Sequence, residues 1–388
     1  MTSTRPTSAA IVSVVAGTRL LVLLVGLLAV TIVGAIPPVP AQVLRDVSAH
    51  EAANLLARWD TLFYDTIATS GYQWDPAQFR RENVVFFPLY PLLMRWGGAA
   101  LGGRPLLAGL IVSLIAFAGA MMLVYRLARL ELGGDYGWRV VLLISTFPYA
   151  LYYSVVYTES LFLLLTAGAF YAMRRGRPIW LAVCGLASGM TRPNGFWLAL
   201  PLACLALWPP KLDGPESPRV PRVSPRTALW LLLACAPIVG AIVFSIYLQV
   251  RFGDALAWVH GQAAWGTPLL GRLPAVDPPP VPGQPVVTLT EVLVYVGNVA
   301  AFVVAVASIR PIARTVGLAY GLWIAVNIFP PVAAHLFVSL GRFTSVLFPV
   351  FFWMAIRIRR QRVARVAFAF AAAQLVLAGW FFLWRPVV

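Results

Sequence analysis

The stretch Pro105–Ala128, PLLAGLIVSLIAFAGAMMLVYRLA, decides the fold of this chain. It contains one charged residue, Arg126, near its end. A lipid bilayer is crossed by roughly 20 mostly apolar residues, because only a helix pairs every backbone amide within its own segment. The stretch therefore predicts a membrane-spanning helix.

Ten further apolar stretches have the same character. They cover residues 11–36, 139–155, 157–173, 179–190, 193–208, 228–249, 288–308, 315–330, 343–356 and 366–384. The chain of 388 residues is 60% hydrophobic and 11% charged, whereas soluble domains carry about 25% charged residues. This composition excludes a disordered chain or a collagen-like fibre, and it argues against an ordinary soluble enzyme. We predict an all-α polytopic membrane protein with about 11 transmembrane helices.

The basic residues divide unequally between the two sides of such a bundle. With the N-terminus in the cytoplasm, the inner side, which includes Arg19, holds 19 cations and four acids, and the outer side holds 11 cations and ten acids. Cytoplasmic loops of membrane proteins carry an excess of Lys and Arg. The net charge of +16 is therefore a signal of topology, and we expect no nucleic-acid partner. The first span is too long for a signal peptide and is read as a retained helix.

The chain reads as one transmembrane unit, residues 1–388, with three long connections. Residues 37–104 form the first outer loop, 209–226 a cytoplasmic linker rich in proline, and 251–287 a second outer loop. The three cysteines all fall inside spans, so no disulfide framework is expected.

Within the first outer loop, residues 51–70 show a helical period. Leu55, Trp59 and Phe63 share one arc, and Arg58 shares the opposite, polar arc. The pattern predicts an amphipathic helix in the membrane interface. Asp60 lies on the border between the two arcs, a suitable place for a general base at the membrane–water boundary.

Several short motifs follow one another in a recognisable order. They are Arg58-Trp59-Asp60, Tyr64, Ile67-Ala68, Gly71-Tyr72, Glu82, Phe86-Phe87-Pro88-Leu89-Tyr90-Pro91, Tyr157-Thr158-Glu159-Ser160-Leu161-Phe162, Thr191-Arg192-Pro193-Asn194-Gly195, Gln262 with Trp265-Gly266, Gly341-Arg342-Phe343 and Phe348-Pro349. In this order they resemble the PIG-V-type mannosyltransferases of the GT-C superfamily, which are polytopic glycosyltransferases that use polyprenyl-phosphate sugars. The resemblance runs along nearly the whole chain and implies a GT-C-like helical bundle.

The resemblance also implies a reaction. A hexose, with mannose as the implied sugar, would pass from a polyprenyl-phosphate carrier to a hydroxyl of a glycolipid, glycan or protein on the outer face, with inversion. The donor already carries a phosphate leaving group, so the reaction needs a base for the acceptor and cations for the phosphate. Asp60 is the candidate base, and Arg192 and Arg342 are the candidate phosphate ligands.

Further residues are candidates for supporting the site or binding substrate. Glu159, flanked by apolar runs, is expected to pair with Arg192 or to orient it. Glu82 would either hold the surroundings of Asp60 in place or pair with Arg80 or Arg81. The remaining candidates are Arg58, Trp59, Tyr64, Trp265, a surface on which a sugar ring can stack, and His335, close in sequence to Arg342.

No cofactor is expected beyond the lipid-linked donor. The three histidines lie far apart in sequence and lack the spacing of a zinc site, so we predict a metal-independent reaction. The lipid bilayer is an expected partner.

Two other classes of protein also fit an apolar, positive-inside chain. A lipid-linked sugar transporter or flippase would more often show two matching halves with broken helices, and a non-catalytic subunit of a glycan-assembly complex would not need Asp60 in this setting. The 29 arginines against one lysine favour a GC-rich, bacterial genome. The expected location is therefore the inner membrane of a bacterium, with the C-terminus and the active site on the outer face.

Overall fold

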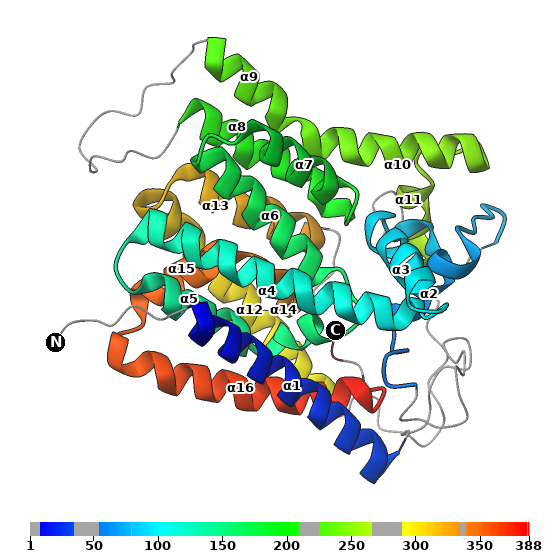
Figure 1. Cartoon of the computed structure of the whole chain (residues 1–388), viewed down its shortest axis with the longest axis horizontal. Helices are drawn as coiled ribbons and strands as arrows, with labels where there is room; N and C mark the ends of the chain where they lie inside the picture. Colours follow the sequence, from blue (N-terminus) through cyan, green and yellow to red (C-terminus); the bar gives the residue numbers. More distant parts are fainter. Residues whose placement is uncertain are drawn as a thin grey trace.

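The computed structural model describes residues 8–34, 54–78, 80–208, 225–265, 289–333, 339–385 and 387. Within these ranges every regular element is a helix, which confirms the predicted all-α fold class. The long helices lie roughly along one direction and form a bundle, with α2 and α3 beside one end of it (Figure 1).

Sixteen α-helices and four 3₁₀ helices are assigned in the described ranges. In chain order they are α1 (Ser8–Val33), α2 (Thr61–Ser70), η1 (Asn83–Val85), α3 (Leu89–Ala100), α4 (Pro105–Leu132), α5 (Tyr136–Thr146), η2 (Pro148–Ser154), α6 (Glu159–Arg174), α7 (Pro178–Gly189), η3 (Pro193–Leu198), α8 (Ala199–Leu207), α9 (Pro225–Ala234), α10 (Ala236–Phe252), α11 (Ala257–His260), η4 (Gly261–Trp265), α12 (Leu289–Thr315), α13 (Leu318–Ala333), α14 (Leu340–Ser345), α15 (Phe348–Arg357) and α16 (Arg360–Phe382). Each of the eleven predicted apolar stretches coincides with one helix or with two consecutive helices.

The bundle is that of a multi-pass membrane protein. Five helical segments in the described ranges are long and apolar enough to cross a membrane, and a sixth is added if η2 and α6, which meet at an angle of 98°, count as one span. The helices α7, η3 with α8, α13 and α15 are apolar but shorter. The figure of eleven spans stays a prediction.

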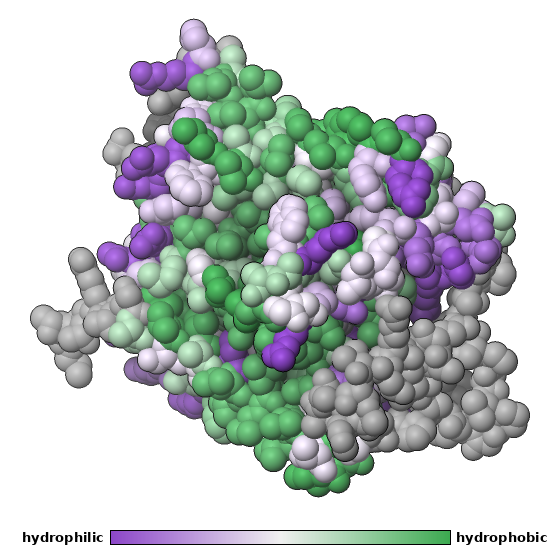
Figure 2. Space-filling view, turned by 45° about the vertical axis from the view of Figure 1, so that its right-hand side comes forward, coloured by the Kyte–Doolittle hydropathy of each residue, from purple (hydrophilic) through white to green (hydrophobic). Residues whose placement is uncertain are grey.

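Many large apolar side chains lie on the described surface of the bundle. In Figure 2 the hydrophilic residues gather mainly at two opposite edges, with green, hydrophobic side chains between them. Large apolar side chains that are exposed include Leu24, Ile115, Trp180 and Val250. Such a surface belongs against lipid, because a soluble monomer rarely exposes large continuous apolar patches.

One buried arginine explains how the break between α5 and η2 is tolerated. Arg19, in the middle of α1, is 3% exposed and donates to the carbonyl of Ser145 at 2.6 Å and to that of Ala150. The last carbonyls of a helix have no partner within it, so the guanidinium supplies one where water is excluded. Arg19 is therefore buried inside the bundle, and its assignment to the inner side of the membrane stays a prediction.

The first outer loop differs from its prediction. The helix expected over residues 51–70 begins only at Thr61, and Asn54–Leu56 form a turn; residues 51–53 lie outside the described ranges. The cause is Trp59, whose φ of 53° is left-handed and interrupts a right-handed helix. The polar arc expected at Arg58 was wrong as well, because Arg58 is buried.

The other two long connections are described only in part. The predicted linker over 209–226 is described for its last two residues, which begin α9. The second outer loop is described up to Trp265 and contains α11 and η4.

Candidate active site

Four charged side chains meet at the end of the bundle that carries α2 and α3. Each comes from a place where a helix begins or breaks: Asp60 directly before α2, Glu159 at the start of α6, Arg192 between α7 and η3, and Arg342 in α14. Broken helices bring polar backbone and side chains together within a membrane protein, where a continuous helix presents only side chains.

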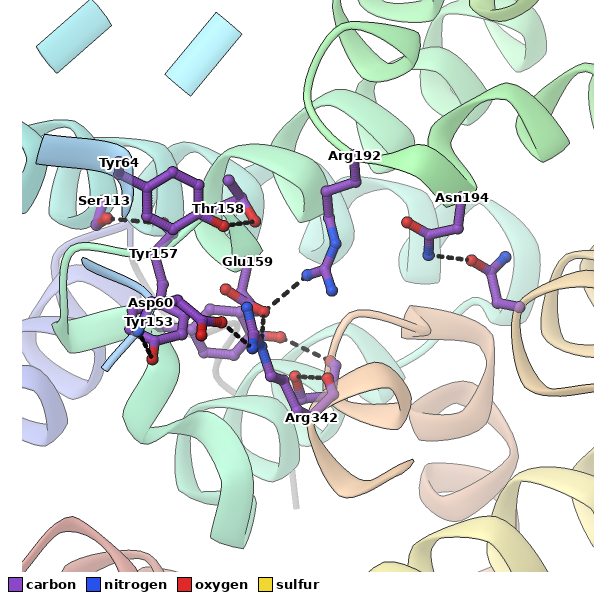
Figure 3. Close-up of polar contacts among 12 residues, drawn as sticks. Asp60, Tyr64, Ser113, Tyr153, Tyr157, Thr158, Glu159, Arg192, Asn194 and Arg342 are labelled. Atoms are coloured by element: carbon purple, nitrogen blue, oxygen red, sulfur yellow. Dashed lines mark hydrogen bonds and ion pairs between the residues drawn. The ribbon is translucent and has the colours of Figure 1, made fainter. Parts of the chain in front are cut away.

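The four side chains form one chain of ion pairs. Arg342 Nη1 donates to Asp60 Oδ2 at 2.8 Å, and Arg342 Nε donates to Glu159 Oε1. Arg192 Nη1 donates to the same Oε1 at 2.7 Å. In Figure 3 the two arginines approach Glu159 from opposite sides, and Asp60 lies against Arg342 alone. The network joins two positive and two negative charges.

Burial differs along this network and separates two roles. The Glu159 side chain is wholly buried, those of Arg192 and Arg342 are 9% and 11% exposed, and that of Asp60 is 24% exposed. Among the described residues, Glu159 Oε2 has no hydrogen-bond partner. Glu159 therefore holds the arginines from behind, while Asp60 reaches the open side.

The open side is a cavity of about 380 Å³. Asp60, Arg192 and Arg342 line it, together with aromatic rings. These rings belong to Trp59, Tyr64, Phe86, Phe87, Tyr152, Tyr157, Phe343 and Phe381. A pocket with a few convergent charges on apolar walls is typical of small-molecule sites.

Two tyrosines that precede Glu159 complete the surroundings of Arg342. Its guanidinium carbon lies 4.6 Å from the ring centre of Tyr157 and 5.1 Å from that of Tyr152. The Tyr157 hydroxyl also accepts the backbone N–H of Asp60 at 3.2 Å. The sequence assigned no role to either ring. For Tyr157, its position in the quoted motif with Glu159 was the available signal, whereas Tyr152 lies outside the quoted motifs.

Tyr64 lies at the wall of the cavity, as expected of a supporting residue. Its hydroxyl is 3.5 Å from Thr158 Oγ1, and its ring is edge-on to those of Phe86 and Tyr90. Burial raises the pKa of the Tyr64 hydroxyl above its ordinary value. The hydroxyl therefore stays protonated at neutral pH and keeps a proton that it can donate.

Glu82 organises the loop beside the cavity. Its Oε1 accepts from Arg80 Nε at 2.7 Å, and its Oε2 accepts the backbone N–H of Asp75 at 2.8 Å. It does not line the cavity. Of the two expectations for Glu82, the structure shows the pairing with Arg80.

The structure describes the second outer loop up to residue 265 and does not describe residues 334–338. Trp265 ends η4, its neighbour Gln262 lines the cavity, and His335 lies outside the described residues. Searching the described residues for metal sites finds no group of three or more His, Cys, Asp or Glu side chains.

Comparison with known proteins finds similarity to one family over part of this chain. Residues 35–206 match the family described as Mannosyltransferase (PIG-V), and this range holds Asp60, Glu159 and Arg192. A GPI mannosyltransferase 2 of Cryptococcus neoformans is 26% identical over 162 residues, which are 39% of this chain and 37% of the relative. The chain thus spans little more than a third of the length of that curated relative.

Solved structures of an oligosaccharyltransferase from Archaeoglobus fulgidus align with the chain more loosely. One, in complex with Zn and sulfate, has a TM-score of 0.44 at 11% identity and covers 94% of this chain and 53% of its own. Another, with an inhibitory peptide and a dolichol-phosphate, has a TM-score of 0.43 at 12% identity and covers 95% and 56%. The resemblance predicted from the sequence motifs is confirmed by the family match, over residues 35–206, as one to the PIG-V mannosyltransferases.

Proposed function

We propose that this chain is an integral membrane mannosyltransferase. It moves mannose from a polyprenyl-phosphate carrier to a hydroxyl acceptor at the outer face of the membrane and inverts the anomeric carbon. The family match over residues 35–206 supports the class of enzyme, and the cavity beside the outer loops supports the place of the reaction.

One observation carries the proposal: a carboxylate and three guanidinium groups line the same cavity, and the third of these groups belongs to Arg81. Asp60 is the more exposed acid of the network, and Arg342 and Arg192 stand beside it with Glu159 behind them. A base for a hydroxyl and cations for a phosphate are the two requirements of transfer from a phosphate-linked sugar. Guanidinium groups stay charged and bind phosphate through two parallel hydrogen bonds.

In the proposed step the donor phosphate lies against Arg192 and Arg342. Asp60 accepts the proton of the acceptor hydroxyl while the acceptor oxygen bonds to the anomeric carbon. The bond from that carbon to the phosphate oxygen breaks, and its electron pair leaves with the polyprenyl phosphate. The phosphate carries the leaving charge, so no protein acid is needed.

The pairing of Arg342 with Asp60 couples binding of the donor phosphate to the availability of the base. Oδ2 of Asp60 accepts from Arg342 Nη1 at 2.8 Å. A donor phosphate competes for the same guanidinium and leaves Oδ2 available to the acceptor hydroxyl. Glu159 keeps Arg342 in place during this exchange, because its bond to Nε is separate.

The Asp60→Asn variant tests the proposal. In membranes supplied with labelled polyprenyl-phosphate-mannose, it should lose transfer by about 10²- to 10⁴-fold, the usual contribution of a general base. Asp65→Asn, one turn further along α2, is the matched control and should keep its activity.

Near-normal transfer by correctly inserted Asp60→Asn protein would contradict the assignment of Asp60 as the base. Movement of a lipid-linked sugar across sealed vesicles, without a new glycosidic bond, would favour the transporter instead. Activity in neither assay would favour the non-catalytic subunit. The acceptor class, a lipoglycan, a phospholipid-linked mannoside or a protein, is identified by glycan profiling of a deletion strain.

A further inference from the structure

Three non-glycine residues in the described ranges have a left-handed backbone; two line the cavity and the third packs against one of them. They are Trp59, Ser339 and Trp384, with φ of 53°, 64° and 61°. Trp59 and Ser339 line the cavity, and the ring of Trp384 lies 5.4 Å from that of Trp59. A bulky residue keeps this conformation only where its surroundings hold it, and such residues gather at functional sites.

The surroundings of Trp59 are the end of the last helix. Its indole Nε1 donates to the carbonyl of Phe381 at 3.2 Å, and the neighbouring Arg58 Nε donates to the carbonyl of Phe382 at 3.0 Å. Both carbonyls belong to the last turn of α16, where helical acceptors have no partner in the helix. The first outer loop is thereby fixed to a helix more than 300 positions later in the chain.

Arg58 and Trp384 complete this attachment. Arg58 Nη1 donates back to the carbonyl of Asn54 at 2.6 Å, and its guanidinium carbon lies 5.0 Å from the centre of the Trp384 ring. The Trp384 ring therefore packs against both Arg58 and Trp59. We call Arg58, Trp59 and Trp384 the clasp.

Asp60 directly follows Trp59, a residue of the clasp, in the chain. Its backbone N–H is held by the Tyr157 hydroxyl at 3.2 Å, and its carboxylate meets Arg342. A change in the backbone of Trp59 turns the Asp60 side chain directly, since the two residues share a peptide group. The direction of Asp60 thus depends on the end of α16.

Arg58 itself is in no position to bind substrate. It is 1% exposed, does not line the cavity, and spends its Nε and Nη1 on backbone carbonyls. The same separation holds for Trp384, which is 6% exposed and is absent from the cavity wall.

We propose that Arg58 and Trp384 are positioning residues, which hold Trp59 in its left-handed conformation on the end of α16 and so aim Asp60 into the cavity. The proposal rests on the proposed function, in which Asp60 is the base. It predicts that damage to the clasp slows the chemical step and leaves the donor phosphate site, formed by Arg192 and Arg342, intact.

The experiment compares Trp384→Ala, Trp384→Phe and Trp380→Ala in the full-length protein. With polyprenyl-phosphate-mannose as donor, Trp384→Ala should lower kcat by about tenfold to a hundredfold at an unchanged donor KM, the cost of a small misplacement of a catalytic group. Trp384→Phe keeps a ring against Arg58 and Trp59 and should restore most of kcat. Trp380, one turn earlier on α16 and outside the clasp, is the matched control and should keep its activity.

A second variant covers the case in which Trp384→Ala is not recovered as a monodisperse protein. Arg58→Lys keeps the charge and the aliphatic stem but has one nitrogen in place of the fork that reaches Phe382 and Asn54. It should show the same loss of kcat at an unchanged donor KM.

Wild-type kcat in Trp384→Ala, an equal loss in Trp380→Ala, or a loss that appears in donor KM alone would each overturn the proposal. Asp60→Asn separates this outcome from a failure of the proposed function. If Asp60→Asn is inactive while the clasp variants are normal, only the clasp proposal fails; if Asp60→Asn transfers normally, the function itself is wrong.

Discussion

Glu159 shows how this protein accommodates charge away from water. One carboxylate oxygen accepts from both Arg192 and Arg342, and the side chain has no exposed surface. Its place at the first residue of α6 adds the favourable field of a helix N-terminus. Removing one partner of a buried ion pair generally costs about 3–5 kcal/mol. The cost of keeping these charges buried is a reason to assign them a function.

Replacing Arg192 by Ala should weaken donor binding. A charge-assisted hydrogen bond contributes about 1.5–3 kcal/mol, so the donor Kd should rise roughly tenfold to a hundredfold. Glu159 keeps Arg342 in this variant, which favours recovery of folded protein. Donor affinity is measured by titration of the purified protein with polyprenyl-phosphate-mannose.

Arg174→Ala is the control for this measurement. Arg174 also forms a buried pair, with Glu131 at 2.5 Å, but away from the cavity, so its loss should lower stability without changing donor affinity. Unchanged donor affinity in Arg192→Ala, or an equal change in Arg174→Ala, would count against a phosphate ligand at Arg192.

At the scale of elements, the residues of the site lie at helix starts and breaks. The sequence contains a signal for only some of these breaks. Pro193 follows Arg192 directly and marks the break before η3, since proline cannot continue a helix from the preceding turn. The bend of 98° between η2 and α6 has no comparable signal. The helix predicted over 51–70 was too long because its period was followed through Trp59, whose conformation depends on α16.

Glycines set the distance between α7 and α10, the helices beside the break at Arg192. A Cβ on Gly240 would lie 2.2 Å from the carbonyl oxygen of Leu186, and one on Gly189 would lie 1.9 Å from that of Pro237. These distances are far below contact, so the two backbones must separate if either glycine gains a side chain.

Gly240→Ala should therefore destabilise the protein by about 1–3 kcal/mol, the usual cost of overpacking. Thermal unfolding in detergent is the measurement. Gly17→Ala in α1 is the control: a Cβ there meets nothing within 4 Å, so alanine should leave the midpoint unchanged or raise it slightly. A Gly240→Ala midpoint equal to that of the parent would contradict the close packing.

At the scale of the whole molecule, charge and hydropathy define two ends and a band between them (Figure 2). Exposed arginines at one end include Arg129 at the end of α4, Arg177 before α7 and Arg362 at the start of α16. Arg95 on α3 and Arg104 before α4 are exposed at the other end. The cavity opens at this second end. Arg19 is buried instead and serves a helix break inside the bundle.

The orientation predicted from these charges is open to a labelling test. In a variant with its three cysteines replaced, a membrane-impermeant maleimide added to intact cells should label Ser70→Cys at the end of α2. Thr315→Cys at the end of α12 should react only after permeabilisation. Both positions are exposed in the folded chain, so a difference in labelling reports the side of the membrane and not burial within the protein. The reverse pattern would place the cavity on the cytoplasmic side.

By itself the sequence determined the helical, membrane-spanning class and singled out Asp60, Glu159, Arg192 and Arg342. These conclusions depend on local properties, since hydropathy and backbone pairing within a helix are counted along the chain. Only the tertiary structure decided how these residues meet, because Asp60 and Arg342 are 282 positions apart. It alone decided that α16 receives Arg58, 324 positions before its partner carbonyl. Unpaired carbonyls at a helix end accept any donor that the packing brings to them, and that choice depends on the whole bundle.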